Sequence, residues 1–293
     1  MELLILVRSS KVKLDNRFLF TKRSLLLYLA LAVFVLIVLI PFYWLMKAAV
    51  STPDQLVKIP PIYFPEVGLN NFYELAKQIP LGNYIFNSLI FSTSTAIATV
   101  FFSFLAAYAF ARIKFRGSAL VLWALVVTMA LPEIATIIPL YKMLGAVGLL
   151  DKLSGLIFVM TSALAPFTVW VFVPFIQQVP ESMEEAAVID GAKLWTILWK
   201  IFLPICKPAI VTMLIINFVN AWNNLLYPLA FSVTASSKCL SVAITEVFQA
   251  QVPWGKPWHL ISALGVIMVI PVIILILSSQ KAVVKGLTKG AVK

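Results

Sequence analysis

The chain has 293 residues, of which 61% are hydrophobic and only 12% charged, whereas soluble proteins are roughly 25% charged. This composition excludes an ordinary soluble domain and predicts an all-α integral membrane protein. The net charge of +11 comes from lysines and arginines that cluster at the ends of apolar segments. That pattern indicates membrane orientation and argues against a nucleic-acid partner.

The first two apolar segments are predicted to cross the membrane as helices. A basic N-terminus, residues 1–24, precedes an uncharged run at residues 25–46, which is long enough for a bilayer core of about 30 Å. That run exceeds the roughly 7–15 residues of a signal-peptide core and further spans follow, so we interpret it as an uncleaved first span. Residues 81–111 form the second predicted span, whose many serines and threonines favour close contacts with other helices.

The third predicted span, residues 118–141, is interrupted by Pro132 and Glu133. An acidic side chain at this depth is costly in lipid and is a functional candidate by default. The alternatives are that Glu133 lies near the external interface or pairs structurally with a neighbour. The fourth predicted span, residues 153–177, contains two prolines that we expect to kink it.

A polar loop at residues 179–204 separates the fourth span from the fifth and holds four of the chain's twelve acidic residues. Glutamates fill the first turn of a predicted short helix, where negative charge complements the helix dipole. Gly191 can end that helix in a left-handed conformation, and Pro204 is expected to stop a second helix. Ala186 and Ala187 offer a small surface that another protein could approach closely. The loop is therefore predicted to be a helix–turn–helix.

The fifth predicted span, residues 207–231, carries an unusual density of side-chain amides. Asn217, Asn220 and Asn224 follow helical spacing, so we expect them on one face of the helix. Amides there could bond a passing solute, or they could bond neighbouring helices, which is their commoner use in bundles. The sixth predicted span is residues 260–280, and a basic tail follows at residues 281–293.

The central loop resembles the EAA loop of permeases from ABC importers. The matching positions are Glu185-Ala186-Ala187, Gly191 and Ile201-x-Leu203-Pro204, with the spacing EAA-x3-G-x9-I-x-L-P. An AWN-x2-L-x-P-L-x-F pattern at residues 221–231 and the end of the tail, residues 286–293, are similar to maltose-type sugar permeases. In that family the loop is cytoplasmic and docks on an ATPase. The resemblance thus implies coupling roles for Glu184, Glu185, Ala186, Ala187, Asp190, Gly191 and Pro204.

The resemblance also implies a complex with a second homologous permease, two ATPase subunits and a periplasmic or extracellular solute-binding protein, all at a lipid membrane. The implied function is import of a sugar, an oligosaccharide, and similarity to the second permeases of alginate-oligosaccharide importers brings alginate-derived substrates into that class. From their own chemistry, the residues that we expect as candidates to line a pathway are Asn217, Asn220, Trp222, Asn223, Asn224, Tyr227 and Glu133. The two aromatic rings among them offer flat faces to a sugar.

The chain itself holds no chemistry of an enzyme. It lacks the GxxxxGKS or GxxxxGKT phosphate loop, so we expect ATP and Mg²⁺ to bind the partner ATPase and this chain to need no cofactor. Its single histidine and two cysteines have no metal-ligand spacing.

Two further classes of protein stay open. An ion-coupled secondary transporter would require intramembrane charges and broken helices, and Glu133 is the only firm candidate for such a charge. A signalling or assembly scaffold has no support beyond the docking loop.

Charge distribution predicts the orientation of the chain. With both termini in the cytoplasm, 16 of the 23 lysines and arginines lie in inner segments and seven in outer ones, as the positive-inside rule requires. This orientation also places the 179–204 loop in the cytoplasm, where ATP is. The sequence therefore predicts a multi-pass protein of a bacterial inner (cytoplasmic) membrane.

Overall fold

The computed structural model describes residues 22–113, 115–249 and 255–291, and this part of the chain is built from helices. Five helical segments are long and apolar enough to cross a membrane, and a sixth span results if the bent pair α5 and α6 counts as one. The predicted all-α membrane fold is therefore confirmed. The helices are α1 (Lys22–Val50), α2 (Pro53–Val57), α3 (Asn70–Gln78), α4 (Leu81–Arg112), α5 (Ser118–Thr128), α6 (Glu133–Ala146), α7 (Leu153–Gln177), α8 (Glu181–Ile189), α9 (Leu194–Ile197), α10 (Leu203–Asn223), α11 (Leu226–Phe231), α12 (Leu240–Gln249) and α13 (Trp258–Ala291).

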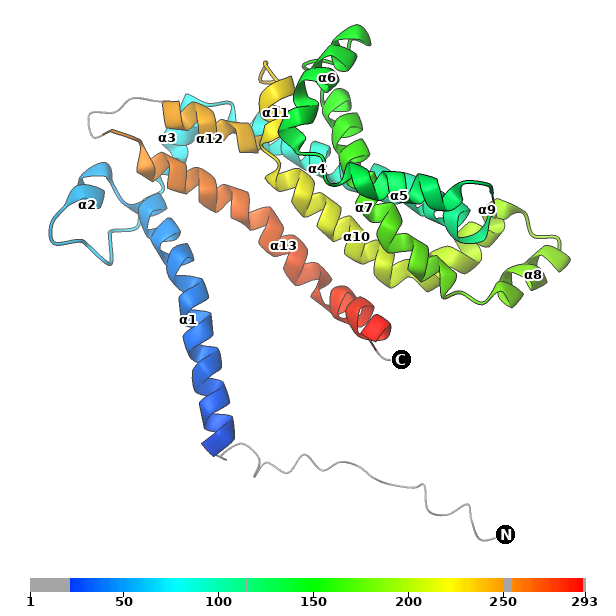
Figure 1. Ribbon diagram of the computed structural model, residues 1–293. Coiled ribbons are helices and arrows are strands. Elements are labelled where there is room, and N and C mark those ends of the chain that lie inside the picture. The colour runs from blue at the N-terminus through cyan, green and yellow to red at the C-terminus, as the bar shows by residue number, and fades with distance from the viewer. Residues whose placement is uncertain (1–21, 114, 250–254, 292–293) are drawn as a thin grey trace.

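Helix α4 lies at the centre of the bundle and packs along α7 and α10 (Figure 1). Phe104 of α4 meets Phe172 of α7 edge to face, with 5.7 Å between the ring centroids. The hydroxyl-rich face of α4 is buried, and Ser92 and Thr95 are fully enclosed. This helix therefore faces protein rather than lipid, as its composition predicts, because small polar side chains let neighbouring helices approach closely.

Helix α1 stands apart from this bundle. It runs away from the other helices and meets α13 and α3 toward its C-terminal end (Figure 1). Along most of its length the side chains are exposed all round, and none of its apolar window is buried. A helix that is apolar on every side requires lipid or another chain around it.

The third predicted span is not a straight helix. The chain breaks between α5 and α6, and the two helices meet at an angle of 104°. Pro132, in an extended conformation, precedes the first residue of α6, Glu133. Proline cannot donate the backbone hydrogen bond that would continue α5, and its ring disfavours a helical residue before it. The expected interruption thus becomes a sharp change of direction.

The fifth predicted span also differs from the structure. Its helix ends at Asn223, Asn224 is extended, and a separate short helix, α11, follows. At the other end Pro204 does not stop a helix, which corrects the sequence prediction. Instead α9, a π-helical turn at Leu198–Phe202 and α10 run on as one segment. Proline is tolerated in the first turn of α10 because the wider π-helical turn before it changes the hydrogen-bond register.

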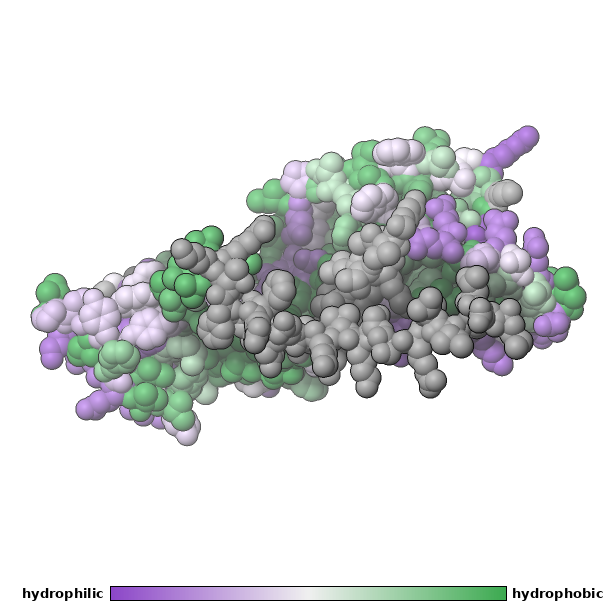
Figure 2. All heavy atoms as spheres, turned by 90° about the horizontal axis from the view of Figure 1, so that it is seen from below, coloured by the Kyte–Doolittle hydropathy of each residue, from purple (hydrophilic) through white to green (hydrophobic). Residues whose placement is uncertain are grey.

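The two ends of the chain are only partly described. Residues 1–21 of the predicted basic N-terminus and residues 292–293 of the tail lie outside the described residues. The backbone of α13 continues past residue 280, the predicted end of the sixth span, to Ala291. Seen from below, hydrophilic side chains gather toward the end of the molecule that carries α8 (Figure 2).

A close backbone approach at the start of α7 generates a test of this packing. A Cβ atom added at Gly155 would overlap the carbonyl oxygen of Leu149, which is fixed because the Leu149 amide donates to the Leu144 carbonyl. Gly155→Ala should therefore lower the free energy of unfolding by about 1–3 kcal/mol. Thermal unfolding in detergent measures the loss. Gly82→Ala is the matched control, because its Cβ meets open space in α4, and an equal loss there would contradict the packing argument.

Candidate functional site

Helix α8 is ended by a complete glycine cap. Gly191 has a φ of 77°, in the left-handed region, as its place in the sequence predicts. The Ala192 amide donates to the Ala187 carbonyl at 2.9 Å, and the Gly191 amide donates to the Val188 carbonyl at 3.0 Å. This pair of bonds is the Schellman pattern, which turns the chain sharply while satisfying carbonyls at the end of the helix. Gly191 thereby fixes the angle at which α8 leaves the membrane domain.

A buried arginine fastens α8 to the last residue of α4. The Arg112 side chain is only 8% exposed, and its Nε lies 3.0 Å from Glu184 Oε2. Its Nη2 donates to the Val179 carbonyl, and the guanidinium lies over the Phe202 ring, 5.3 Å from the centroid. Tyr108 of α4 donates from its hydroxyl to the same Glu184 carboxylate. Sequence reasoning missed Arg112 and Tyr108, because nothing in their spacing links them to a loop some 70 residues later.

These contacts divide the predicted coupling residues into two groups. Glu184 faces inward and is engaged within this chain, and Ala187 packs partly against the core, so neither presents its side chain fully to a partner. The members that the structure leaves exposed are Glu185, Ala186, Asp190, Gly191 and Pro204.

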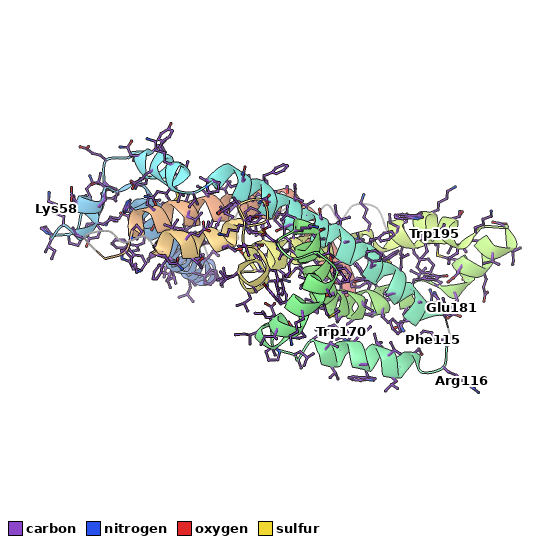
Figure 3. All side chains as sticks on the ribbon, turned by 90° about the horizontal axis from the view of Figure 1, so that it is seen from above. Lys58, Phe115, Arg116, Trp170, Glu181 and Trp195 are labelled. Carbon is purple, nitrogen blue, oxygen red and sulfur yellow. The ribbon has the colours of Figure 1, made fainter. Side chains whose placement is uncertain are left out.

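The outer surface of α8 is a candidate docking surface of mixed character. Val188 and Ile189 expose 58% and 85% of their surface beside the acidic residues, an apolar element that sequence reasoning did not single out. An open cleft of about 720 Å³ is lined by the salt-bridged Arg112 together with Glu181, Glu184, Glu185, Val188 and Ile189. Figure 3 shows Phe115, Arg116, Glu181 and Trp195 around this same end of the molecule. Exposed apolar side chains rimmed by charge are typical of a surface that binds another protein.

A second feature is a polar cavity where two helix breaks meet. Glu133, at the break before α6, accepts a hydrogen bond of 3.1 Å from the Asn224 amide, at the break after α10. Thr136 and Tyr227 join their hydroxyls at 3.2 Å, and the Asn224 side chain caps the backbone amide of Tyr227. The cavity between α5, α6, α7 and α11 measures about 440 Å³ and is also lined by Ser162 and Phe167. Non-helical backbone at membrane depth is tolerated only inside protein or beside water, so this cavity is the candidate pathway.

Of the predicted pathway residues, Glu133 and Tyr227 line this cavity, and Asn224 is connected to it through its bond to Glu133. Asn220 and Asn223 are exposed elsewhere on α10. The expected shared face of amides is therefore not formed, because α10 ends before Asn224 and that residue turns toward α6.

Asn217 and Trp222 have structural surroundings. Asn217 is fully buried and bonds Thr168 of α7 at 3.1 Å, which is the interhelical use of an amide. Trp222 is also buried, stacks on Phe218 and donates from its indole to the Met268 carbonyl at 3.0 Å. Its ring offers no free face to a sugar, which corrects the sequence interpretation.

Asp151, also missed by sequence reasoning, holds the loop after α11. Its Oδ1 accepts the backbone amides of Val233 and Thr234 at 2.8 and 3.0 Å, and its carboxylate also accepts the hydroxyls of Thr234 and Ser237. Burial pushes the pKa of this carboxyl upward, but the hydrogen bonds from Ser237, Thr234 and Val233 outweigh it and hold the pKa well below its usual range. The loop therefore keeps α11 and Tyr227 in place against α6.

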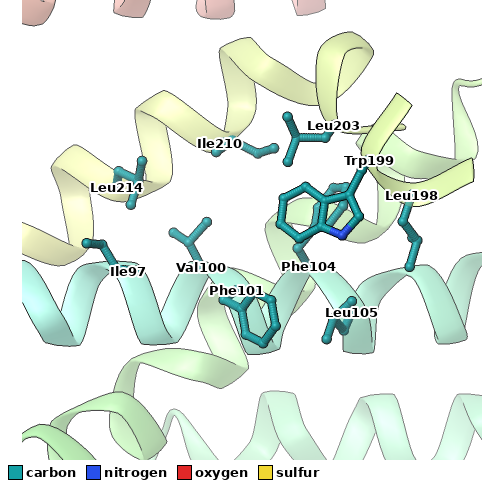
Figure 4. Close-up of a pocket in the computed structure, with 10 residues that line it drawn as sticks. All are labelled: Ile97, Val100, Phe101, Phe104, Leu105, Leu198, Trp199, Leu203, Ile210 and Leu214. Atoms are coloured by element: carbon teal, nitrogen blue, oxygen red, sulfur yellow. The ribbon is translucent and has the colours of Figure 1, made fainter. Parts of the chain in front are cut away.

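The remaining pocket between helices is apolar. It lies between α4 and α10, measures about 220 Å³ and is lined by carbon-rich side chains with Trp199 of the π-helical turn at its edge (Figure 4). It holds no group that could recognise a polar solute. Among the described residues there is also no group of three or more histidine, cysteine, aspartate or glutamate side chains that could hold a metal ion. Both cysteines are free and buried.

Long apolar helices, a polar cavity at two helix breaks and an exposed docking helix together define a multi-pass permease of the inner membrane. Residues 99–289 match the family described as "Binding-protein-dependent transport system inner membrane component", and the chain belongs to that family.

Curated relatives agree with this membership. The chain is 33% identical to the sulfoquinovosyl glycerol transport system permease protein SmoH of Agrobacterium fabrum, over 87% of this chain and 89% of that protein. It is 31% identical to the melibiose/raffinose/stachyose import permease protein MelC of Bacillus subtilis, over 87% and 91%. Both relatives are named as permease proteins of sugar transport systems.

Solved structures share the fold. A bacterial ABC transporter involved in the import of the acidic polysaccharide alginate superposes with a TM-score of 0.76 at 21% identity, over 89% of this chain and 98% of that one. A bacterial alginate ABC transporter in complex with an alginate pentasaccharide-bound periplasmic protein gives a TM-score of 0.62 at 18% identity, over 89% and 96%.

The Asp151 contacts generate a pH-dependent prediction. Because the folded pKa is depressed, the ionised carboxylate stabilises the fold above the unfolded value of roughly 3.9, and that stabilisation is lost as the pH falls further. At pH 7, Asp151→Asn should lower the melting temperature in detergent by about 2–4 °C. The difference from the wild type should shrink below about pH 4. Asp54→Asn, at an exposed aspartate, should change neither value, and a pH-independent deficit at Asp151 would contradict the assignment.

Proposed function

We propose that this chain is a transmembrane subunit of a binding-protein-dependent ABC importer that passes an oligosaccharide across the inner membrane. Membership of the family carries this proposal, since it describes a transport component of that kind. The named substrates of the curated relatives are mono- to tetrasaccharide units or their glycosides, which supports a sugar as the solute. The alginate importers share the fold, so longer acidic oligosaccharides are included among the candidate substrates.

The exposed surface of α8 is the proposed docking site for the ATPase, which binds ATP and Mg²⁺. Its exposed acid, Glu185, would meet a basic side chain there, while Ala186 allows close approach and Val188 and Ile189 supply apolar contact. Two ATPase subunits, a second permease and a solute-binding protein complete the proposed complex. The apolar window of α1, none of which is buried, supports a permease partner, because it requires lipid or a neighbour that the described residues of this chain do not supply.

The cavity at Glu133 is the proposed portion of the pathway. Hydroxyl and carboxylate groups there can exchange hydrogen bonds with a sugar, and Phe167 offers an apolar surface for its ring. An ion-coupled secondary transporter is the alternative that Glu133 alone would allow, but it has no need for the docking helix. Uptake by vesicles distinguishes the two kinds of transporter. A requirement for internal ATP without an ion gradient supports the ABC importer, and a requirement for an ion gradient supports the secondary transporter.

The first test concerns orientation. Both termini, α8 and the loop at residues 113–117 are proposed to be cytoplasmic. In a background lacking Cys206 and Cys239, single cysteines at Ser118 and Lys289 should react with an impermeant maleimide only in inside-out vesicles. Cysteines at Lys58 and Lys256 should react only in right-side-out vesicles. Reaction of the Lys289 position from outside would end the model with both termini inside.

The second test concerns the docking helix. Gly191→Val forces a β-branched residue into the left-handed region at a cost of about 1–2 kcal/mol. The strain should change the angle between α8 and the helix that follows it. Glu185→Lys reverses the exposed charge. Both variants should reach the membrane but lose bound ATPase, or keep it and lose the hydrolysis that the binding protein stimulates. The measurements are membrane abundance, co-purified ATPase and stimulated hydrolysis.

Gly148→Val is the matched control for backbone strain. Gly148 also has a left-handed φ, 66°, but lies in the loop between α6 and α7, away from α8. It should keep ATPase binding. Full stimulated hydrolysis and transport in both docking-helix variants would remove the coupling role of α8.

A further inference from the structure

We propose that α4 is a rigid strut that transmits movement between α8 and the segment at residues 232–249, with Arg112 and Asn87 as positioning residues at its two ends. The proposal rests on the function proposed above, because α8 is taken as the docking site of the ATPase. It adds how movement of that site would reach the opposite end of the molecule.

Stiffness is the first property that singles out α4. Of the five long apolar helical segments in the described ranges, the other four contain internal prolines, namely Pro41, Pro166, Pro174, Pro204, Pro208 and Pro271. Helix α4 has no proline within its 32 residues, and its one glycine is its second residue. A proline removes a backbone hydrogen bond and permits a kink, so its absence leaves α4 as an unbroken rod of about 48 Å.

The end of α4 beside α8 is fastened by charge. Arg112 contacts the Glu184 carboxylate and the Val179 carbonyl and lies over Phe202, so one guanidinium contacts α8, the residue before its N-cap and the π-helical turn. The side chain is only 8% exposed, so solvent screens its ion pair with Glu184 little, and Nη2 adds a hydrogen bond to the Val179 carbonyl. Helix α8 has no extensive packing against another described helix. Arg112 is therefore the principal attachment of α8 to a span.

The far end of α4 is fastened by neutral polar groups. The Asn87 amide donates to the carbonyls of Ala235 and Lys238 at 3.0 and 2.9 Å, and the Ser88 hydroxyl accepts the Leu240 amide at 2.6 Å. Tyr84 donates to the Glu246 carboxylate at 3.0 Å. The 232–249 segment is in turn held by Asp151, which anchors the loop beside the polar cavity.

These attachments join three distant sites through one helix. Figure 3 shows α4 running from the half of the molecule that ends at Lys58 to the end marked by Glu181 and Arg116. A shift of α8 cannot be absorbed by bending of α4, so it displaces the 232–249 segment and the loop beside the cavity. The converse also holds, since coupling between two sites is reciprocal. A partner seated on the outer segment would thereby influence the ATPase.

The test uses one variant at each end of the strut, with a matched control for each. Arg112→Ala and Asn87→Ala remove the attachments. Arg116→Ala and Asn83→Ala remove the same side chains at exposed positions beside them. The complex with its ATPases and binding protein is reconstituted in vesicles and supplied with raffinose, maltotriose and an alginate trisaccharide. Each preparation is measured for co-purified ATPase, hydrolysis with and without the binding protein and sugar, and melting temperature.

The expected result is a loss of stimulation by roughly fivefold or more in each end variant, with ATPase still bound and both controls at the wild-type level. The double variant should lose no more stimulation than the worse single variant, because either break interrupts the same strut. Its melting-temperature losses should add, because the two sites are too distant to share contacts. Additive losses of stimulation, or full stimulation in either single variant, would overturn the strut. Absence of ATP-dependent sugar uptake by the wild type would instead overturn the proposed function, and the strut with it.

Discussion

The interaction on which the rest of this structure depends is the burial of the Arg112 guanidinium between α4, α8 and the π-helical turn. A cation that is this little exposed requires compensating partners. The Glu184 carboxylate pairs with it by charge, the Val179 carbonyl accepts a hydrogen bond from Nη2 and the Phe202 ring lies under it, while Nε makes no hydrogen bond. That requirement fixes the start of α8, while the left-handed Gly191 fixes its end. The outward surface of α8 is thus presented at one angle, set by electrostatics on one side and by backbone geometry on the other.

A second constraint comes from the membrane. Inside a bilayer each backbone amide and carbonyl must be paired, so two helix breaks are costly unless they support one another. Glu133 at one break and Asn224 at the other do so through a direct hydrogen bond, and Asn224 also caps the start of the segment that carries Tyr227. The first of these bonds joins two side chains, and the second pairs a backbone amide. Together they hold the two breaks against each other beside the cavity that is the proposed pathway.

The prolines mark the points at which the spans can bend. The spans other than α4 carry them, and the bend between α5 and α6 adds a further point of flexure next to the cavity. A stiff central helix among kinked neighbours lets the cavity change shape while the distance between α8 and the opposite segment is kept. This division of stiffness suits the proposed role, in which the chain opens to alternate sides of the membrane while it stays bound to an ATPase.

The sequence by itself determined the membrane class, the positions of most spans and the capped docking helix, because these depend on local hydropathy and on the conformational freedom of single residues such as Gly191. It also located the interruption at Pro132, since proline acts on its immediate neighbours. Only the tertiary structure decided which amide bonds a residue of the cavity wall and which amides pack between helices. Asn217 and Asn224 look alike along the chain, yet one is buried against Thr168 and the other bonds Glu133. The role of a side-chain amide or an arginine is set by partners distant in sequence, and helical spacing contains no information about them.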